Sequence, residues 1–419
     1  MRYLGRVNFR VRRDFAKLWV GQTISEVGSR ISRDGIPLTA LITLRANPMQ
    51  MGFLSAISSA SVFVFALGAG VVVDRLKKRP VMIATDLCRA ALLLLVPLAS
   101  LMHLLSMTIL MTIAGIAGAL TVLFDVAYQS YLPALVDPDE LLDSNRRLGM
   151  SASAAELLGP LLTGVLVKVV TAPIAILLDA LSFLVSATSV WAIRKAEPTP
   201  EPAPRAAPLA EAFDGLRFIW GHPLLRALML RSVMAFLAGG FFFTLYFLNA
   251  TRVVHMGTPA LGAVVALGGA GGLAGASMAG RLSTRLGSGP VFFGMAVLIG
   301  CAQLLIPLSS QFPRYGFVYL CIQQFFGDMG WMIYIVNERT LRQSLAPPRI
   351  LGRVNSAMQL ASMGMLPFGA LTGGYLASRY GIAQTLWVAS AGTLLSCLWL
   401  IPLLKNKERW PRLLTSDVA

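Results

Sequence analysis

Four ionisable residues crowd a short stretch near the N-terminus, SEVGSRISRDG, which holds Glu26, Arg30, Arg33 and Asp34. In a helix, spacings of four place Glu26, Arg30 and Asp34 on one face, with the two carboxylates about 12 Å apart along the axis. Such acids can bind and release a proton, and a neighbouring arginine can bind substrate charge or tune the acid. In the alternative interpretation, Arg30 and Arg33 only neutralise the two acids and hold the helix in place.

A second candidate group lies in the C-terminal half, where Asp328 follows Gln324 by about one helical turn. A lone acid beside an amide suggests a contact with a polar substrate, or alternatively an internal hydrogen-bonded pair. The stretch GGFFFTLYF adds Phe242 and Tyr246, whose rings could stack on an apolar substrate. Aromatic residues of this kind also form belts at the membrane interface, which is the alternative for this stretch.

The composition places these residues in membrane-crossing helices. The 419 residues are 56% hydrophobic and 13% charged, with a mean hydropathy of +0.68, whereas soluble domains carry about 25% charged residues. A helix needs about 20 apolar residues to cross a bilayer, and an ionisable residue at that depth costs about 2.5–3.5 kcal/mol, which makes it a functional candidate. The sequence predicts an all-α membrane protein with twelve transmembrane helices, at 15–44, 51–73, 80–102, 104–127, 150–170, 173–193, 224–249, 259–280, 290–310, 315–337, 355–377 and 382–404.

The basic residues indicate how the chain is oriented, because they gather in alternate loops and leave the other loops nearly neutral. Positive loops stay in the cytoplasm, so we expect a multi-pass protein of the cell (inner) membrane with both termini cytoplasmic. Orientation explains the formal net charge of +16, and no nucleic-acid partner is expected. The expected partners are the lipid bilayer, a small-molecule substrate and protons as the coupling ion.

One long hydrophilic connection, RKAEPTPEPAPRAAP, divides the chain into six predicted spans on either side. We expect an N-terminal six-helix bundle at 1–193, a cytoplasmic linker with an interfacial helix at 194–223, a C-terminal six-helix bundle at 224–404 and a cytoplasmic tail at 405–419. Two such halves, related as parallel repeats, are typical of a secondary transporter with its substrate site between them.

The two halves share a charged turn, GVVVDRLKKRP at Gly70–Pro80 and GRLSTRLGSGP at Gly280–Pro290, at an offset of 280 − 70 = 210 residues. We interpret it as a cytoplasmic gate whose charges pair when the gate closes and separate when it opens, with Gly70 allowing a close helix approach. The alternative is a signal of membrane orientation alone. The proposed gate residues are Gly70, Asp74, Arg75, Lys78, Arg79 and Arg285.

The pattern Gly70-x-x-x-Asp74-Arg75-x-x-Lys78-Arg79 resembles the loop 2–3 signature of the major facilitator superfamily. The stretches LWVGQTISEVGSRIS, DALSFLVSA and LRQSLAPPRILGRVNS are similar to a branch of bacterial exporters that includes enterobactin and macrolide efflux proteins. The resemblance implies the major facilitator fold, with two pseudo-symmetric six-helix bundles whose first, fourth, seventh and tenth spans line a cavity.

The stretch ELLGPLLTG is similar to the fifth-span motif of antiporters in this superfamily, with Gly159, Pro160 and Gly164 in place and Thr163 where a second glycine is usual. The resemblance implies that this helix seals the outer side while the inner side is open; ordinary small-residue packing is the alternative. The fourth span departs from proton-coupled drug exporters, because Met111 stands where those proteins carry an arginine.

Together these features predict a secondary active transporter that exports a small organic molecule (a drug, siderophore or metabolite) by proton antiport with alternating access. Glu26 and Asp34 are the proton-coupling candidates. The substrate-binding candidates are Arg30, Arg33, Asp328, Gln324, Phe242 and Tyr246. The sequence shows no phosphate-binding loop, metal-ligand spacing or nucleophile–base set, so no cofactor, metal or enzymatic activity is expected. Uptake, uncoupled facilitative transport and a non-transporting receptor are the alternatives.

Overall fold

The computed structural model describes residues 9–195, 197 and 208–401, and within them the only regular structure is helix. The predicted cytoplasmic tail, 405–419, and residues 198–207 of the predicted linker lie outside the described residues. Contacts between Cα atoms divide the chain into two compact units. We call Met1–Leu44 with Val64–Ala206 the N-unit, and Arg45–Phe63 with Ala207–Ala419 the C-unit.

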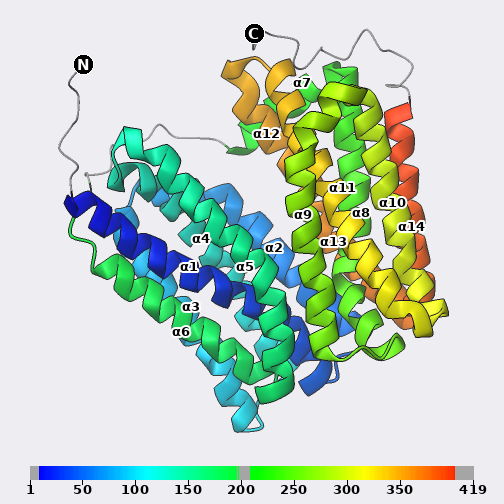
Figure 1. The fold of residues 1–419 in the computed structure, drawn as a ribbon, viewed down its shortest axis with the longest axis horizontal. Helices are drawn as coiled ribbons and strands as arrows, with labels where there is room; N and C mark the ends of the chain where they lie inside the picture. The colour runs from blue at the N-terminus through cyan, green and yellow to red at the C-terminus, as the bar shows by residue number, and fades with distance from the viewer. Residues whose placement is uncertain (1–8, 196, 198–207, 402–419) are drawn as a thin grey trace. The chain divides into compact units, whose positions relative to one another are not determined.

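The N-unit is a bundle of long helices (Figure 1). In chain order they are α1 (Phe9–Leu38), the π-helix η1 (Thr39–Thr43), α2 (Pro48–Asp74, shared with the C-unit), α3 (Lys78–Leu101), α4 (Met107–Leu135), η2 (Pro138–Glu140), α5 (Leu141–Val170) and α6 (Ala172–Trp191). Helix α1 packs on α5 and α6, and α3 packs on α4 and α6. This packing brings the charged stretch of α1 against α5.

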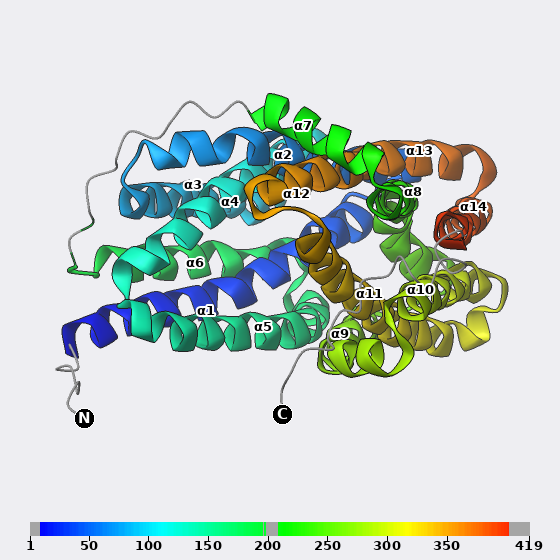
Figure 2. The same ribbon diagram turned by 90° about the horizontal axis from the view of Figure 1, so that it is seen from above.

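The C-unit is a second bundle, several of whose helices are seen nearly end-on in Figure 2. They are α7 (Pro208–Gly221), α8 (Pro223–Leu248), the π-helix η3 (Asn249–Val253), α9 (Thr258–Leu286), α10 (Ser288–Gln311), η4 (Pro313–Tyr315), α11 (Gly316–Leu345), α12 (Pro348–Met363), α13 (Met365–Tyr380), α14 (Ile382–Ser396) and η5 (Cys397–Leu400). Helix α11 packs on α9 and α10, and α8 packs on α13 and α14.

The 210-residue offset seen in the charged turn recurs in the backbone. The π-helices η1 and η3 begin at Thr39 and Asn249 (249 − 39 = 210), and both are followed by a non-glycine residue with positive φ, Arg45 at 51° and His255 at 57°. Prolines inside α3 and α10, Pro97 and Pro307, also differ by 210. The two halves therefore repeat one helical pattern, as the sequence predicted.

The first half of α2 belongs to the C-unit because it packs tightly on α13. A Cβ placed on Gly52 would lie 2.8 Å from the carbonyl oxygen of Ala370 and 3.0 Å from Cα of Gly374. Only glycine permits such a backbone approach. The bundle boundaries predicted from the sequence, which assign all of α2 to the N-terminal half, remain a proposal.

Nine of the described helical segments are long and apolar enough to cross a membrane. The remaining predicted spans fall on α1 and α11, which have 30 residues each but more charge, and on α12 and α13, which divide the eleventh span at Gly364 into two helices of 16 residues. These helices are consistent with the twelve membrane spans predicted from the sequence.

Helix α7 forms where the sequence predicted an interfacial helix, and it docks on α12. The Nη1 atom of Arg353 lies 3.0 Å from Oδ2 of Asp214, and a Cβ on Gly215 would overlap the backbone of Arg353. Ile219 is buried, while Phe213 and Trp220 are exposed. The apolar stripe of the helix is therefore only partly used for packing within the C-unit, and its contact with the membrane surface remains a prediction.

Candidate functional site

Ion pairs around Glu156 join the charged stretch of α1 to α5. Arg30 Nη1 lies 2.5 Å from Glu156 Oε2, and Arg33 Nη2 lies 3.0 Å from Glu156 Oε1. Arg33 Nε also lies 3.9 Å from Asp34 Oδ1, which is a longer and weaker pair. The two oxygens of one carboxylate thus bind two guanidinium groups, and this carboxylate comes from a different helix.

The fifth-span motif explains why α5 can approach α1 so closely. Gly159 follows Glu156 by about one turn, and a Cβ on it would overlap Cβ of Arg30. Pro160 and Gly164 are buried, and the hydroxyl of Thr163, where the motif usually has a second glycine, donates to the carbonyl of Gly159 at 2.8 Å. Small residues on one face of α5 therefore place the carboxylate of Glu156 beside the arginines. The outer seal expected of this motif remains a prediction.

The two candidate acids of α1 are not the main partners of the arginines. Asp34 is only 7% exposed, and its one ion pair is the 3.9 Å contact with Arg33. Glu26 is half-buried, and within the part of the chain that the structure describes no basic side chain lies within 4 Å of its carboxylate. It lies within electrostatic reach of Arg30 and of Asp125 and Tyr128 on α4. The arginines therefore lie closer to Glu156 than to Glu26 or Asp34, and both interpretations of the charged stretch remain predictions.

The sequence interpretation missed Glu156, although the residue opens the motif ELLGPLLTG. The signal was its position one turn before Gly159, on the face of α5 that carries the small residues. It could not be linked to Arg33 from spacing, because the two residues are 123 positions apart in the chain.

Most of the proposed gate residues lie at the end of α2 and the start of α3, where Arg79 binds the C-terminal end of α6, and Arg285 lies near the C-terminal end of α9. Its Nε donates to the carbonyl of Val190 at 3.1 Å and its Nη2 to that of Trp191 at 2.5 Å. These carbonyls lie in the last turn of α6, and the C-terminal end of a helix favours a cation. The backbone N–H groups of Lys78 and Arg79 donate to the carboxylate of Glu197.

The other proposed gate residues are less engaged. Asp74, Arg75 and Arg285 are exposed, and no ion pair within 4 Å involves them among the described residues. A Cβ on Gly70 would meet nothing within 4 Å, so the close approach expected at Gly70 is absent from this structure. The turn is thus fastened to its own bundle by Lys78 and Arg79, and its role as a gate remains a prediction.

In the C-unit, the structure brings together most of the second candidate group. Gln324 Nε2 donates to Asp328 Oδ2 at 3.1 Å, and both side chains face Gly268 of α9, whose missing Cβ leaves them room. Tyr246 lies within electrostatic reach of Asp328. Phe242 is only 8% exposed, so it packs inside the C-unit and offers little of its ring to a substrate.

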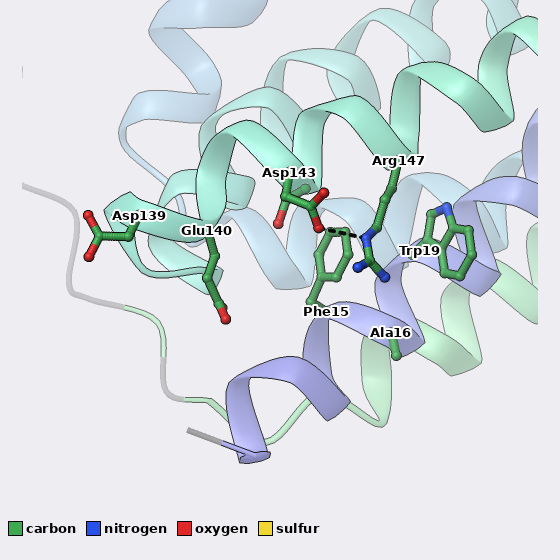
Figure 3. A pocket seen from close by; sticks show the side chains of 8 residues that line it. Phe15, Ala16, Trp19, Asp139, Glu140, Asp143 and Arg147 are labelled. Atoms are coloured by element: carbon green, nitrogen blue, oxygen red, sulfur yellow. Dashed lines mark hydrogen bonds and ion pairs between the residues drawn. The ribbon is translucent and has the colours of Figure 1, made fainter. Parts of the chain in front are cut away.

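A cavity that the sequence did not indicate lies between α1 and the start of α5 (Figure 3). It measures about 340 Å³. Arg147 and Arg146 both bind the carboxylate of Asp143 at 2.8 Å, and Trp19 donates through Nε1 to Ser151 Oγ at 2.9 Å. In Figure 3, Asp139 points away from the other side chains. The internal pairs already satisfy Asp143 and Trp19, so the cavity offers few free binding groups.

Comparisons with known proteins agree on the kind of protein. A sequence model of the transmembrane secretion effector family, of the major facilitator (MFS) class, matches residues 9–409. The chain is 23% identical over 409 residues to an uncharacterized MFS-type transporter, YfiS, of Bacillus subtilis, covering 95% of this chain and 94% of that protein. It is 22% identical over 414 residues to macrolide efflux protein A of Streptococcus pyogenes, covering 94% and 96%.

Solved structures share the fold. The nucleoside transporter NupG superposes with a TM-score of 0.76 at 10% identity, covering 94% of this chain and 100% of that one. A bacterial homologue of the iron transporter ferroportin, in an inward-facing state, gives 0.73 at 16% identity, covering 93% and 98%. With the helical repeat described above, these matches confirm the major facilitator fold. The chain therefore belongs to the transmembrane secretion effector family of major facilitator transporters.

Proposed function

We propose that this transporter exports a small organic molecule from the cytoplasm in exchange for protons, and that Glu26 and Asp34 carry the protons. The observation that carries the proposal is the pairing of Arg30 and Arg33 with Glu156 at 2.5 and 3.0 Å. In a helix that we predict to cross the membrane, this pairing leaves Glu26 without an ion pair and Asp34 with only the 3.9 Å contact to Arg33. An ionisable group in that position is a functional candidate, and a buried acid with a weak partner can change its protonation during transport.

The export direction is supported by relatives and not by geometry. The matching family is described as secretion effectors, and one relative is a macrolide efflux protein. NupG is a nucleoside transporter, but at 10% identity it carries the fold alone. Uptake and uncoupled facilitative transport are therefore the alternatives that the experiment must separate.

The gate and seal belong to the same proposal. We place Asp74, Arg75 and Arg285 at a cytoplasmic gate beside the fastened Lys78 and Arg79, and Gly159 with Pro160 at an outer seal. Alternating access between these two ends would then expose Glu26 and Asp34 to each side in turn. The proposal sets the protein in the inner membrane with both termini cytoplasmic.

The test uses everted membrane vesicles that contain a pH-sensitive dye and are energised by respiration. A panel of amphiphilic compounds is added to vesicles with wild type, Glu26→Gln or Asp34→Asn, and with Asp143→Asn, in the first turn of α5, as a control. We expect at least one compound to dissipate the proton gradient with wild type and the control, and not with the two α1 variants.

Two results would count against the proposal. If a compound is expelled from cells by wild type but moves no protons in vesicles, export stands and proton exchange is wrong. If Glu26→Gln and Asp34→Asn both retain full proton movement, the coupling residues lie elsewhere.

A further inference from the structure

The C-unit has a half-open cavity of about 400 Å³ lined by α8, α11 and α12, within the range usual for small-molecule sites. The apolar part of its lining includes Phe236, Trp331, Met358 and Met363. Phe236 and Trp331 meet edge to face, with ring centroids 5.7 Å apart. Flat aromatic surfaces and flexible methionines suit a ligand with a bulky apolar body.

The charged part of the lining carries more positive than negative charge. Arg339, Arg342 and a single acid, Glu338, line the cavity. Arg342 Nε lies 3.5 Å from Glu338 Oε1, yet this nitrogen is buried and receives no hydrogen-bond partner in the described chain. The acid is 7% exposed. One carboxylate thus faces two guanidinium groups and hydrogen-bonds neither of them well.

A third guanidinium, that of Arg231, lies on the ring of Tyr334, a residue that lines the cavity. Arg231 of α8 is 1% exposed, and none of its three side-chain nitrogens forms a hydrogen bond of regular geometry among the residues described, Tyr334 being the one side chain close enough for a weak contact. Its guanidinium carbon lies 3.9 Å from the centroid of the Tyr334 ring, and Tyr334 itself lines the cavity. Glu338 is within electrostatic reach of Arg231 but beyond ion-pair distance. A buried, unpaired guanidinium is unfavourable unless a further anion approaches it.

We propose that this cavity binds an amphiphilic organic anion, whose acidic group approaches Arg342 and Arg339 with Arg231 nearby and whose apolar body lies on Phe236 and Trp331. Three guanidinium groups against one carboxylate leave positive charge that an anion would complement. Calling this ligand the exported compound rests on the proposed function, but the binding site itself does not. Anionic lipid headgroups share the same chemistry, and the experiment distinguishes them.

The test measures binding to the purified full-length protein in nanodiscs of zwitterionic phosphatidylcholine. The probes are pyrenebutyrate and pyrenebutylamine, which share an apolar body and differ in the sign of the charge. Energy transfer from tryptophan, including Trp331, to pyrene reports occupancy, and empty nanodiscs correct for partition into lipid. We expect saturable binding of the butyrate and no saturable binding of the amine.

Variants assign the probe to the cavity. Arg342→Gln and Arg231→Met are expected to weaken butyrate binding about tenfold or more. Glu338→Gln removes the competing carboxylate and is expected to strengthen it. Arg226→Gln alters an exposed arginine of the same helix α8 and is expected to leave binding within about twofold of wild type. Equal butyrate affinity in all four variants, or tighter amine binding that Glu338→Gln abolishes, would overturn the proposal.

Two further readouts exclude structural and lipid explanations. Because Arg231 is unpaired, Arg231→Met is expected to unfold at the same temperature as wild type or higher when no probe is present; a large loss that Glu338→Gln reverses would show a structural ion pair instead. Adding phosphatidylglycerol to the nanodiscs is expected to leave butyrate binding unchanged, and full competition by this lipid would make the cavity a lipid site. Binding needs no gradient, so failure of the transport assay would leave this result intact.

Discussion

The N-unit and the C-unit use one helix crossing for different purposes. In the N-unit, α5 meets α1 where Gly159 lies against Arg30. The equivalent crossing in the C-unit is that of α13 with α8, where Gly369 and Gly240 stand 210 residues after Gly159 and Arg30 (369 − 159 = 210 and 240 − 30 = 210). A Cβ on Gly369 would overlap the backbone of α8 and would lie 3.1 Å from Cα of Gly240. The crossing is kept in both halves, but the N-unit adds an arginine where the C-unit packs glycine on glycine.

Other positions near the crossing are also ionisable in the N-unit and apolar in the C-unit. Glu156, which binds the arginines, corresponds to Leu366 at this offset, and Glu26 corresponds to Phe236. The N-unit has thus placed ionisable groups on a crossing that the C-unit builds from apolar and small residues. This difference indicates that the ionisable groups of α1 are not needed to form the crossing, which favours a role in function.

The largest expected effect comes from substitutions that disrupt the α1–α5 crossing of the N-unit or the α8–α13 crossing of the C-unit. Alanine at Gly369 or Gly159 forces a Cβ into the facing helix, and we expect either variant to lose about 3 kcal/mol of unfolding free energy. Gly239→Ala is the matched control, because its Cβ would lie 3.7 Å from the nearest atom, Cδ1 of Leu366. Thermal unfolding in detergent measures all three. If Gly159→Ala is as mild as Gly239→Ala, the two crossings are not equivalent.

A smaller effect is expected from removing the ion pair that distinguishes the N-unit crossing from the C-unit crossing. The pair Arg30–Glu156 exists only in the N-unit, and we expect a double-mutant cycle of Arg30→Gln and Glu156→Gln to give a coupling energy of about 2 kcal/mol. The double variant should be more stable than the sum of the single losses implies, because neither member of the Arg30–Glu156 pair is left as a lone charge. Arg33 loses its contact with Glu156 in the Glu156 single variant and in the double variant alike, so this loss cancels in the cycle. Coupling indistinguishable from zero would mean that the ion pair contributes nothing to the crossing.

The smallest expected effect concerns Asp14, near the start of α1 and before the predicted span. Burial alone would raise the pKa of this carboxyl, but hydrogen bonds from Lys17 Nζ at 2.7 Å and from the backbone N–H groups of Arg194 and Lys195 at 3.0 Å lower it overall. At the 210-residue offset the C-unit has Leu224, which is buried. These contacts again add a charge to the N-unit.

Because its folded pKa is lowered, Asp14 stabilises the protein above the ordinary aspartate pKa of about 3.9 and loses this contribution as the pH falls further. We expect Asp14→Asn to cost about 1 kcal/mol at neutral pH, and the difference from wild type to shrink below that pKa. The measurement is thermal unfolding of both proteins across an acid pH series. A difference that stays constant with pH would show that the carboxylate charge plays no part.

The helices and their repeat could be predicted because their signals are local. An apolar run of about 20 residues indicates a span by itself, and the charged turn at Gly70–Pro80 has its counterpart within a stretch of equal length. The candidate acids of α1 were visible for the same reason, since charge stands out in an apolar run. The break at Gly364, which divides the eleventh span, was not predicted, because a single glycine is common inside membrane helices.

The partners of those residues could not be predicted because they depend on contacts between distant helices. Arg33 binds Glu156 across 123 positions, and only the α1–α5 crossing brings them together. The contacts of Arg231 could not be predicted either. In the sequence it is an ordinary arginine near the end of a predicted span, but in the structure it is buried against the ring of Tyr334. Phe242 was expected to face a substrate, and its burial follows from which side of α8 meets the bundle.

The most direct test of proton coupling through α1 compares two modes of transport in the same proteoliposomes, using a compound identified in the vesicle screen. Asp34→Asn is measured beside wild type for uphill transport driven by a pH gradient and for counterflow, in which substrate exchanges with substrate and no proton moves. We predict that the variant retains counterflow and loses uphill transport, because a permanently neutral side chain can neither take up nor release a proton. Uphill transport by Asp34→Asn at the wild-type rate would contradict the assignment.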